Sequence, residues 1–378
     1  MKKFKIIIVA LIFLMLGVAL QKNHALTPLK RMLQGRPLKL TPPAHSILDW
    51  DFQKNKTLQP QFSLAEQDFN KIEANQSHYR EKLKELLRLS TFPENFSLQS
   101  RTLEKVDLLK VTREKIEVEV EPGLWIPFYL FIPKELAGPR PCILVFHGHS
   151  SGKIETAGMV PSYQNGNALA LAEAGFVTVA PDLRGFGELG WPGEWEDPEG
   201  HAYGKSIHIQ DAFFNLQVGR TLLGSFIYDA FKILDSLKER KELNLNRLGV
   251  AGTSMGADVA IWFAALEPRV KVVVADNSSL LFYPLPSVNY GKPHACIDTI
   301  PAFNSFFQLQ DIPLLIANRP FLLEFSGEPR ASLPQTQSRL QALYHEAGSP
   351  EQVSFKFYPG KEKFYNETAV EWFKKWLD

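Results

Sequence analysis

The sequence predicts an α/β fold: a mostly parallel, doubly wound sheet flanked by helices, with an N-terminal helical extension and loop-rich cover segments. Short apolar runs alternate with amphipathic stretches from about residue 103 onward, the pattern of a sheet with helices on both faces. Residues 141–146 are continuously apolar, which is typical of a strand buried on both faces. A third apolar run leads directly into Gly252-Thr253-Ser254-Met255-Gly256 and a helix-compatible stretch, so a strand–turn–helix unit lies at the centre of the chain.

Each expected element follows from its local pattern of apolar residues and turn signals. The expected strands are 103–111, 115–120, 125–132, 141–146, 176–180, 247–252, 270–275, 321–326 and 353–358. The expected helices are 63–89, 165–174, 225–240, 258–266, 333–347 and 366–377. Ser63 and Glu66 have capping-box spacing, so the first helix is predicted to begin there. Residues 189–218 and 277–311 lack a clear period and are predicted to be irregular cover segments.

The N-terminus has the pattern of a targeting segment. Lys2, Lys3 and Lys5 precede an apolar run over residues 6–20, which suits a signal h-region better than a membrane span. We therefore expect residues 1–25 to be a signal peptide or signal anchor. An extended arm and a helix should follow over 26–102, and the α/β domain over 103–378. The protein is expected to be exported, either periplasmic or secreted, or anchored in the membrane by this segment alone.

The composition gives no reason to expect nucleic acid, a disulfide framework, a metal or a cofactor. The 378 residues are 45% hydrophobic and 22% charged, and a formal net charge of +1 gives no reason to expect nucleic acid. Two cysteines cannot form a disulfide framework, and Cys142 lies in an apolar run that predicts a buried free thiol. His201 and His208, with Asp211 nearby, lack a third ligand at metal-binding spacing. We expect no metal and no cofactor.

The central unit has the sequence form of a nucleophile elbow, a sharp turn that lifts a serine hydroxyl out of a parallel sheet. Side chains flanking a serine held in this conformation would collide with neighbouring backbone, which explains the two glycines. The pattern predicts Ser254 as a nucleophile. Its oxyanion would be held by the backbone N–H of Met255 and by one from the glycine-rich loop that follows residues 141–146, at Gly148 or His149.

Three motifs carry a resemblance to a known family: Gly-Thr-Ser-Met-Gly at 252–256, His-Gly-His-Ser at 147–150 and Asp-Leu-Arg-Gly-Phe-Gly-Glu at 182–188. Together they resemble the α/β-hydrolase superfamily, and in particular the bacterial acetyl xylan esterase and cephalosporin-C deacetylase-like hydrolases, which are dienelactone-hydrolase-like. Residues 112–133 are similar to the lead-in strands of that group. The resemblance implies an eight-stranded sheet and hydrolysis of a carboxylic ester, with a small-molecule ester as substrate.

The catalytic acid of that family follows the strand that corresponds to 321–326, in a Gly-Glu-x-Asp pattern. Here the segment begins Gly-Glu-Pro-Arg, so Arg330 stands where the aspartate should be. Glu328 lies two residues earlier, and Asp276 ends the preceding strand, a position from which some α/β-hydrolases take their acid. Asp276 and Glu328 are therefore both candidates.

The histidine of that family follows the last strand, in Gly-Gly-His-x-Phe or a close variant. Residues 360–364 read Gly-Lys-Glu-Lys-Phe, so Glu362 occupies the position of the histidine. No histidine lies beyond His345, which falls within a predicted helix. The sequence therefore leaves the general base unidentified.

Other side chains could approach Ser254 from a different direction. His294 in the second cover segment, or His147 and His149 beside the oxyanion loop, are candidates, although each also fits a role as a loop hydrogen-bonding residue. A Ser–Lys pattern with a lysine at 361 or 363 is a further alternative. Two functions therefore stay open. One is an exported serine hydrolase of the acetyl-esterase type, impaired if no base reaches the serine. The other is an inactive α/β-hydrolase-fold binding or scaffold protein that lacks the histidine and aspartate of the family.

Overall fold

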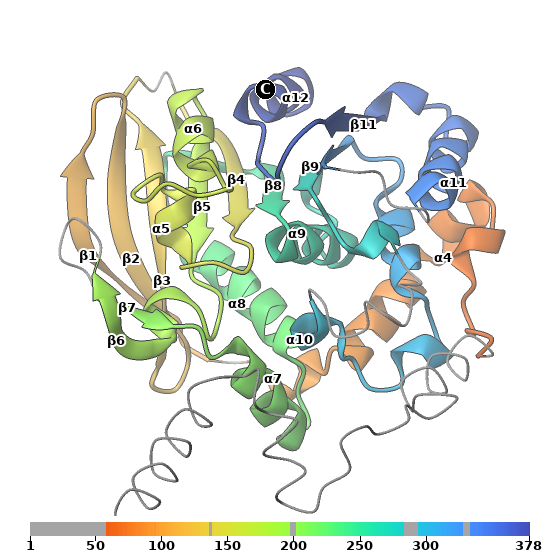
Figure 1. Ribbon diagram of the computed structural model, residues 1–378, viewed down its shortest axis with the longest axis horizontal. Coiled ribbons are helices and arrows are strands. Elements are labelled where there is room, and N and C mark those ends of the chain that lie inside the picture. Colours follow the sequence, from red (N-terminus) through yellow and green to blue (C-terminus); the bar gives the residue numbers. More distant parts are fainter. Residues whose placement is uncertain (1–57, 95, 136–137, 197–201, 283–293, 328–332) are drawn as a thin grey trace, which may run out of the picture. The chain divides into compact units, whose positions relative to one another are not determined.

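A computed structural model describes residues 58–378 apart from 95, 136–137, 197–201, 283–293 and 328–332 (Figure 1). Residues from Leu58 to Asp378 form one compact unit. The predicted targeting segment and the extended arm up to residue 57 lie outside the described residues. Among the helices that are described, none is both long and apolar enough to cross a bilayer.

The unit is built on a nine-stranded sheet in the order β1-β2-β3-β5-β4-β8-β9-β10-β11. Its strands are β1 (Gln99–Asp107), β2 (Val111–Glu121), β3 (Leu124–Pro133), β4 (Arg140–Phe146), β5 (Val177–Pro181), β8 (Leu243–Thr253), β9 (Val270–Asp276), β10 (Phe321–Ser326) and β11 (Val353–Tyr358). The pairs from β1 to β3 and the pair of β3 with β5 are antiparallel, and all others are parallel. The predicted mostly parallel sheet is confirmed, with nine strands where the family resemblance implied eight.

Helices cover both faces of this sheet, as predicted (Figure 1). Apolar side chains of α4 (Phe69–Leu86), α8 (Leu222–Ser236), α9 (Met255–Leu266) and α11 (Leu333–Glu346) join the larger buried cluster. Those of α5 (Lys153–Thr156), α6 (Asn167–Glu173) and α12 (Asn366–Trp376) join a second cluster on the other face. The central strands are buried on both faces because both clusters reach them, which explains their continuously apolar sequences.

The sheet order changes direction between β4 and β8. From β4 the chain continues to β5 on one side, whereas from β8 it continues to β9 on the other side. In open α/β sheets this switch point, outside the carboxyl ends of the strands, is where ligands bind. The loop after β4 and the turn after β8 both lie there, and they contain His149 and Ser254.

Three local expectations are corrected. The first helix begins at Phe69, because the side chain of Asp68 caps it by accepting the backbone N–H of Lys71, whereas Ser63 makes no side-chain cap. The segment expected to be irregular cover contains the hairpin of β6 (Trp191–Glu196) and β7 (Ala202–Lys205), then α7 (His208–Gln217). The second cover segment contains α10 (Ala295–Asp298) and several short 3₁₀ turns. Both cysteines are buried free thiols, as expected for Cys142.

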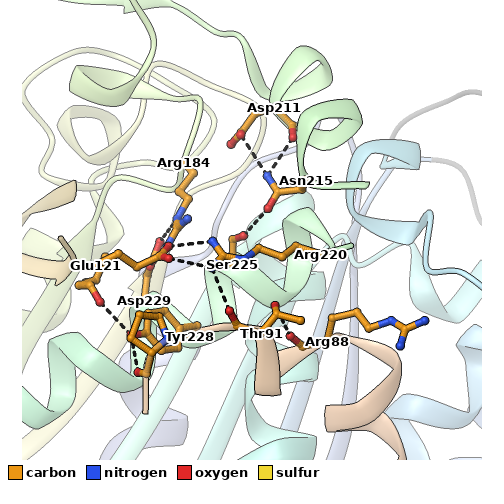
Figure 2. Close-up of polar contacts among 12 residues, drawn as sticks. Arg88, Thr91, Glu121, Arg184, Asp211, Asn215, Arg220, Ser225, Tyr228 and Asp229 are labelled. Carbon is orange, nitrogen blue, oxygen red and sulfur yellow. Dashed lines mark hydrogen bonds and ion pairs between the residues drawn. The ribbon is translucent and has the colours of Figure 1, made fainter. Parts of the chain in front are cut away.

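The loop after β5 is held by buried ion pairs. Arg184 forms a two-pronged contact with Asp229 on α8, at 2.8 Å from Nε and 2.6 Å from Nη2, and lies 3.0 Å from Glu121 (Figure 2). Glu121 also pairs with Arg220 at 2.9 Å. Upstream in the same loop, Asp182 accepts the backbone N–H of Lys153 and pairs with its ammonium group. The Asp-Leu-Arg-Gly motif therefore has a structural role: its ion pairs, called the clamp below, hold the loop after β5 against α8 and the start of α5.

Replacing Asp229 by alanine is expected to lower the free energy of unfolding by about 3 kcal/mol, because it leaves the buried Arg184 without its two-pronged partner. This loss of stability is at the lower end of the range for a buried ion pair, because Glu121 remains in contact with Arg184. Asp235→Ala is the matched control on the same helix. Its pair with Lys238 is exposed and should contribute less than about 1 kcal/mol. Urea unfolding monitored by tryptophan fluorescence measures both, and equal losses would contradict the clamp.

Candidate active site

Ser254 stands on a strained turn between β8 and α9. Its φ of 57° and ψ of −123° lie outside the regions that ordinary residues adopt. The backbone N–H of Ser254 donates to the carbonyl of Asp276 at the end of β9, at 2.8 Å, which fixes the turn against the neighbouring strand. Strain of this kind persists only where surrounding structure enforces it, and such positions cluster at functional sites. The predicted elbow is present.

The two glycines of the elbow are required by close backbone contacts. A Cβ at Gly252 would lie 2.1 Å from the carbonyl oxygen of Gly256. A Cβ at Gly256 would lie 2.2 Å from the carbonyl oxygen of Phe146, at the end of β4. The elbow therefore packs directly against the start of the oxyanion loop, and no side chain fits between them.

His294 contacts the hydroxyl of Ser254. Its Nε2 lies 3.2 Å from Ser254 Oγ, and the imidazole is almost fully buried at the residue that precedes α10. The other ring nitrogen, Nδ1, makes a short contact with a carboxylate oxygen of Asp258. Because Nδ1–H donates to that carboxylate, Nε2 is left as the acceptor for the serine proton.

Asp258 is the carboxylate behind this histidine. It lies on α9 one helical turn after Ser254, and it is completely buried. Its Oδ1 accepts from the hydroxyl of Ser278 at 2.6 Å and from the backbone N–H of Ser279 at 2.8 Å. Its Oδ2 accepts from the hydroxyl of Ser279 at 2.6 Å as well as from His294. Both oxygens of this buried carboxylate are therefore hydrogen-bonded, which holds the side chain in position against His294.

This surrounding sets the protonation of His294. Burial disfavours the imidazolium, but the charge of Asp258 and the hydrogen bond to it outweigh burial, so the pKa of His294 is raised above its usual value. The arrangement suits a proton-accepting group whose charged form is stabilised once the proton has moved.

The loop after β4 lies against the elbow and contains an N–H group without a described acceptor. Gly148 lies against the elbow, since a Cβ on it would be 3.2 Å from Cβ of Ser254. Its N–H already donates to the buried amide of Gln164 at 3.2 Å. Across the described residues, no acceptor is found for the N–H of His149 or for that of Met255 at the start of α9. Of the three predicted donors, His149 and Met255 therefore have unengaged N–H groups, and Gly148 does not.

The predicted acids are placed elsewhere. Asp276 is buried and accepts from the side chain of Asn277 at 2.8 Å, and no hydrogen bond joins it to His294 in the described part of the chain. Its pKa is raised well above the usual value by burial and by the nearby Glu324 and Glu362. An uncharged carboxyl does not stabilise an imidazolium. Glu328 lies outside the described residues.

The remaining candidate bases have other surroundings. His147 is buried, with Nε2 accepting the N–H of Leu183 at 3.0 Å and Nδ1 lying 2.7 Å from the carbonyl of Gly148, so both ring nitrogens are engaged. The pKa of His149 is lowered to about 3 by burial and the neighbouring imidazoles, which leaves it a poor base. The other three candidates are exposed: His345, Lys361 and Lys363. None of these three makes a described hydrogen bond to the elbow.

Known proteins are similar to this chain in sequence and in fold. The model of the Abhydrolase family matches residues 51–375. The chain belongs to that family. This abhydrolase is also similar to the Bacillus subtilis protein YtaP, whose name describes a hydrolase, with 26% identity over 317 residues that cover 79% of this chain and 99% of YtaP.

Several solved structures with the same fold are described as esterases. A Bacteroides fragilis protein described as an acetyl xylan esterase aligns with a TM-score of 0.67 at 20% identity, over 83% of this chain and 82% of that one. Methylesterase BT1017 aligns with a TM-score of 0.64 at 19% identity, over 86% and 68%. A glucuronoyl esterase from Solibacter usitatus aligns with a TM-score of 0.53 at 15% identity, over 77% and 90%. These likenesses agree with the α/β-hydrolase fold of this abhydrolase.

Sequence reasoning did not identify Asp258, although two signals were present. It is the one charged residue in the apolar run of α9, and its spacing from Ser254 is a single helical turn. A charged group at such a position is rarely buried without partners. The hydroxyls of Ser278 and Ser279, which supply those partners, follow β9 and had no distinguishing pattern in the sequence.

Proposed function

We propose that this abhydrolase is a serine-dependent carboxylic-ester hydrolase in which Ser254, His294 and Asp258 act together. The observation that carries the proposal is the continuous chain of contacts from the serine hydroxyl through the imidazole to a buried carboxylate. Nucleophile, base and orienting acid in this order are the arrangement that acyl transfer requires, and geometry rather than chain order defines it.

In the proposed reaction, Ser254 Oγ attacks the ester carbonyl while His294 Nε2 takes the hydroxyl proton. The N–H groups of Met255 and His149 hold the negative oxygen of the tetrahedral intermediate. When the intermediate collapses, His294 gives its proton to the departing alkoxide and an acyl-serine remains. Water then attacks the acyl group by the same route, releasing the carboxylic acid and restoring the serine.

The substrate we propose is a small ester with a short acyl group, of the acetyl type. The similarity to structures described as esterases supports an ester substrate, and the family resemblance of the sequence supports an acetyl group. We also propose that the protein works outside the cytoplasm, because three lysines followed by an apolar run at residues 6–20 are typical of export signals. An inactive binding protein is the alternative, and the contact between His294 and Ser254 favours the hydrolase over it.

An active-site fluorophosphonate probe tests the proposal. The wild-type protein and the control Ser236→Ala, altered at a helix-surface hydroxyl of α8, should label and should hydrolyse 4-nitrophenyl acetate. Ser254→Ala should do neither. A folded wild-type protein that neither labels nor hydrolyses short acyl esters would support the binding or scaffold function instead.

The pH dependence of hydrolysis follows from the pKa of His294. The base must be neutral to accept the serine proton, and its pKa is raised above the usual 6.5 of histidine. We therefore expect kcat/KM to rise with pH through an acid limb whose midpoint lies above 6.5. Initial rates on a soluble ester between pH 4 and 9 give this midpoint. A midpoint below 6 would mean that Asp258 does not act on the histidine in this way.

A further inference from the structure

Three side chains that can bind a metal lie together beside His294. They are His149 in the loop after β4, His208 at the first position of α7 and Cys296 in α10. One potential ligand atom from each lies within 4.8 Å of the other two. These residues are far apart in the sequence, so spacing alone, which pairs His208 with His201 and Asp211, does not indicate the cluster.

The cluster is partly prearranged. Nε2 of His149 lies 3.3 Å from the sulfur of Cys296, and the rings of His149 and His208 are 4.7 Å apart. Phe186 stacks on His208 at 4.6 Å and 15°, which fixes the plane of that ring. The hydroxyl of Ser206 lies 2.5 Å from Nδ1 of His208 and leaves Nε2 of the same ring available. Such support of the far ring nitrogen is typical of metal-binding histidines.

These distances are close to those of a tetrahedral zinc site. Bonds of about 2.3 Å to sulfur and 2.0–2.1 Å to nitrogen place tetrahedral ligand atoms roughly 3.3–3.6 Å apart. The contact between His149 and Cys296 is already in that range. The widest separation, 4.8 Å at most, needs to shorten by about 1.2–1.5 Å, which is within the range of side-chain rotation.

We propose that His149, His208 and Cys296 bind one zinc ion through two imidazole nitrogens and one thiolate, with the fourth position open to water. Imidazole and thiolate together favour zinc over the hard cations magnesium and calcium, which prefer oxygen ligands. On binding, the thiol proton of Cys296 is released to solvent, so affinity should fall as the pH is lowered.

The proposed zinc site lies beside the proposed active site. The ring of His149 lies 5.1 Å from that of His294, so an ion held by His149 would stand next to this second imidazole. The binding of zinc itself does not depend on the proposed hydrolysis.

Metal binding is measured directly on the full chain after treatment with a chelator. Calorimetric titration with zinc chloride should give one ion per chain with a dissociation constant on the order of micromolar or tighter. Titration with cobalt(II), a spectroscopic substitute, should give a thiolate-to-cobalt charge-transfer band. Both results should also be found for Ser254→Ala, which separates failure of the metal site from failure of the proposed hydrolysis.

Matched variants locate the site. Cys296→Ser should remove the cobalt charge-transfer band and weaken the affinity for zinc by about 100-fold or more. Cys142→Ala removes the other buried thiol of the chain and should keep the band. His208→Ala should weaken zinc binding by a similar factor, and it replaces Cys296→Ser as the test if that variant does not fold. His345→Ala, which alters an exposed histidine, should leave zinc binding unchanged. The proposal is overturned if the wild type binds no zinc at 100 µM, or if Cys296→Ser and His208→Ala bind it as the wild type does.

Discussion

Replacing His294 by alanine is expected to lower kcat for ester hydrolysis by about 10⁶-fold, the loss found when the histidine of a serine triad is removed. In this abhydrolase His294 is the imidazole within hydrogen-bond distance of Ser254 in the described part of the chain. With it removed, the serine keeps its elbow and the two N–H donors but has no group to take its proton. Steady-state rates on 4-nitrophenyl acetate and labelling by a fluorophosphonate measure the loss.

The control for this variant is His345→Ala. His345 is an exposed residue in the last turn of α11, and its removal should leave kcat unchanged within about twofold. Thermal unfolding of both variants separates loss of the base from loss of the fold. If His294→Ala retained more than about one per cent of the wild-type rate, the proton acceptor would have to be another group.

Replacing Asp258 by asparagine is expected to lower kcat by about 10⁴-fold, as in the serine protease in which the triad aspartate was replaced in the same way. Asparagine preserves the size of the side chain, but it removes the charge that stabilises the imidazolium of His294. It also allows the wrong ring nitrogen to carry the proton. Rates and the pH profile should change together, because the same charge raises the pKa of His294.

Asp276→Asn is the matched comparison. Asp276 is a candidate acid by sequence, but its pKa is raised by burial and by neighbouring carboxyl groups, so asparagine mimics its uncharged form. Its contact with the elbow is through the backbone carbonyl, which the substitution leaves in place. We expect less than about a threefold change in kcat. A loss as large as that of Asp258→Asn would return the acid to the end of β9.

The sequence predicted the parts of the site that are local in the chain. The strained serine, its two glycines and the loop with His149 all follow from short motifs at the ends of strands, because these motifs encode backbone conformations. The proposed base, His294, is not marked by such a motif and is only one of several candidates in the sequence. His294 lies in a segment without a regular period, and only the packing of α10 against α7 and α8 brings it near Ser254.

The acid is an intermediate case. The family resemblance predicts the catalytic acid after β10, where this chain has Arg330, or at the end of β9. The acid that we propose, Asp258 on α9, depends on a helical turn, which is local, and on burial, which is not. A polar residue at an interior position of an apolar helix is therefore a useful signal, but its partners, Ser278 and Ser279, become visible only in three dimensions.

The elbow and the helix that follows it carry both the proposed nucleophile and the proposed carboxylate, so one strand–turn–helix element would supply two of the three side chains of the triad. In the proposed triad the turn after β11 supplies no side chain that contacts Ser254 through a described hydrogen bond. Its exposed Lys361 and Lys363 should therefore tolerate substitution with little effect on the proposed hydrolysis. Glu362, between them, differs, because its charge adds to the effects that raise the pKa of His294 and of Asp276. A dye or an affinity group is therefore best attached at one of the two lysines.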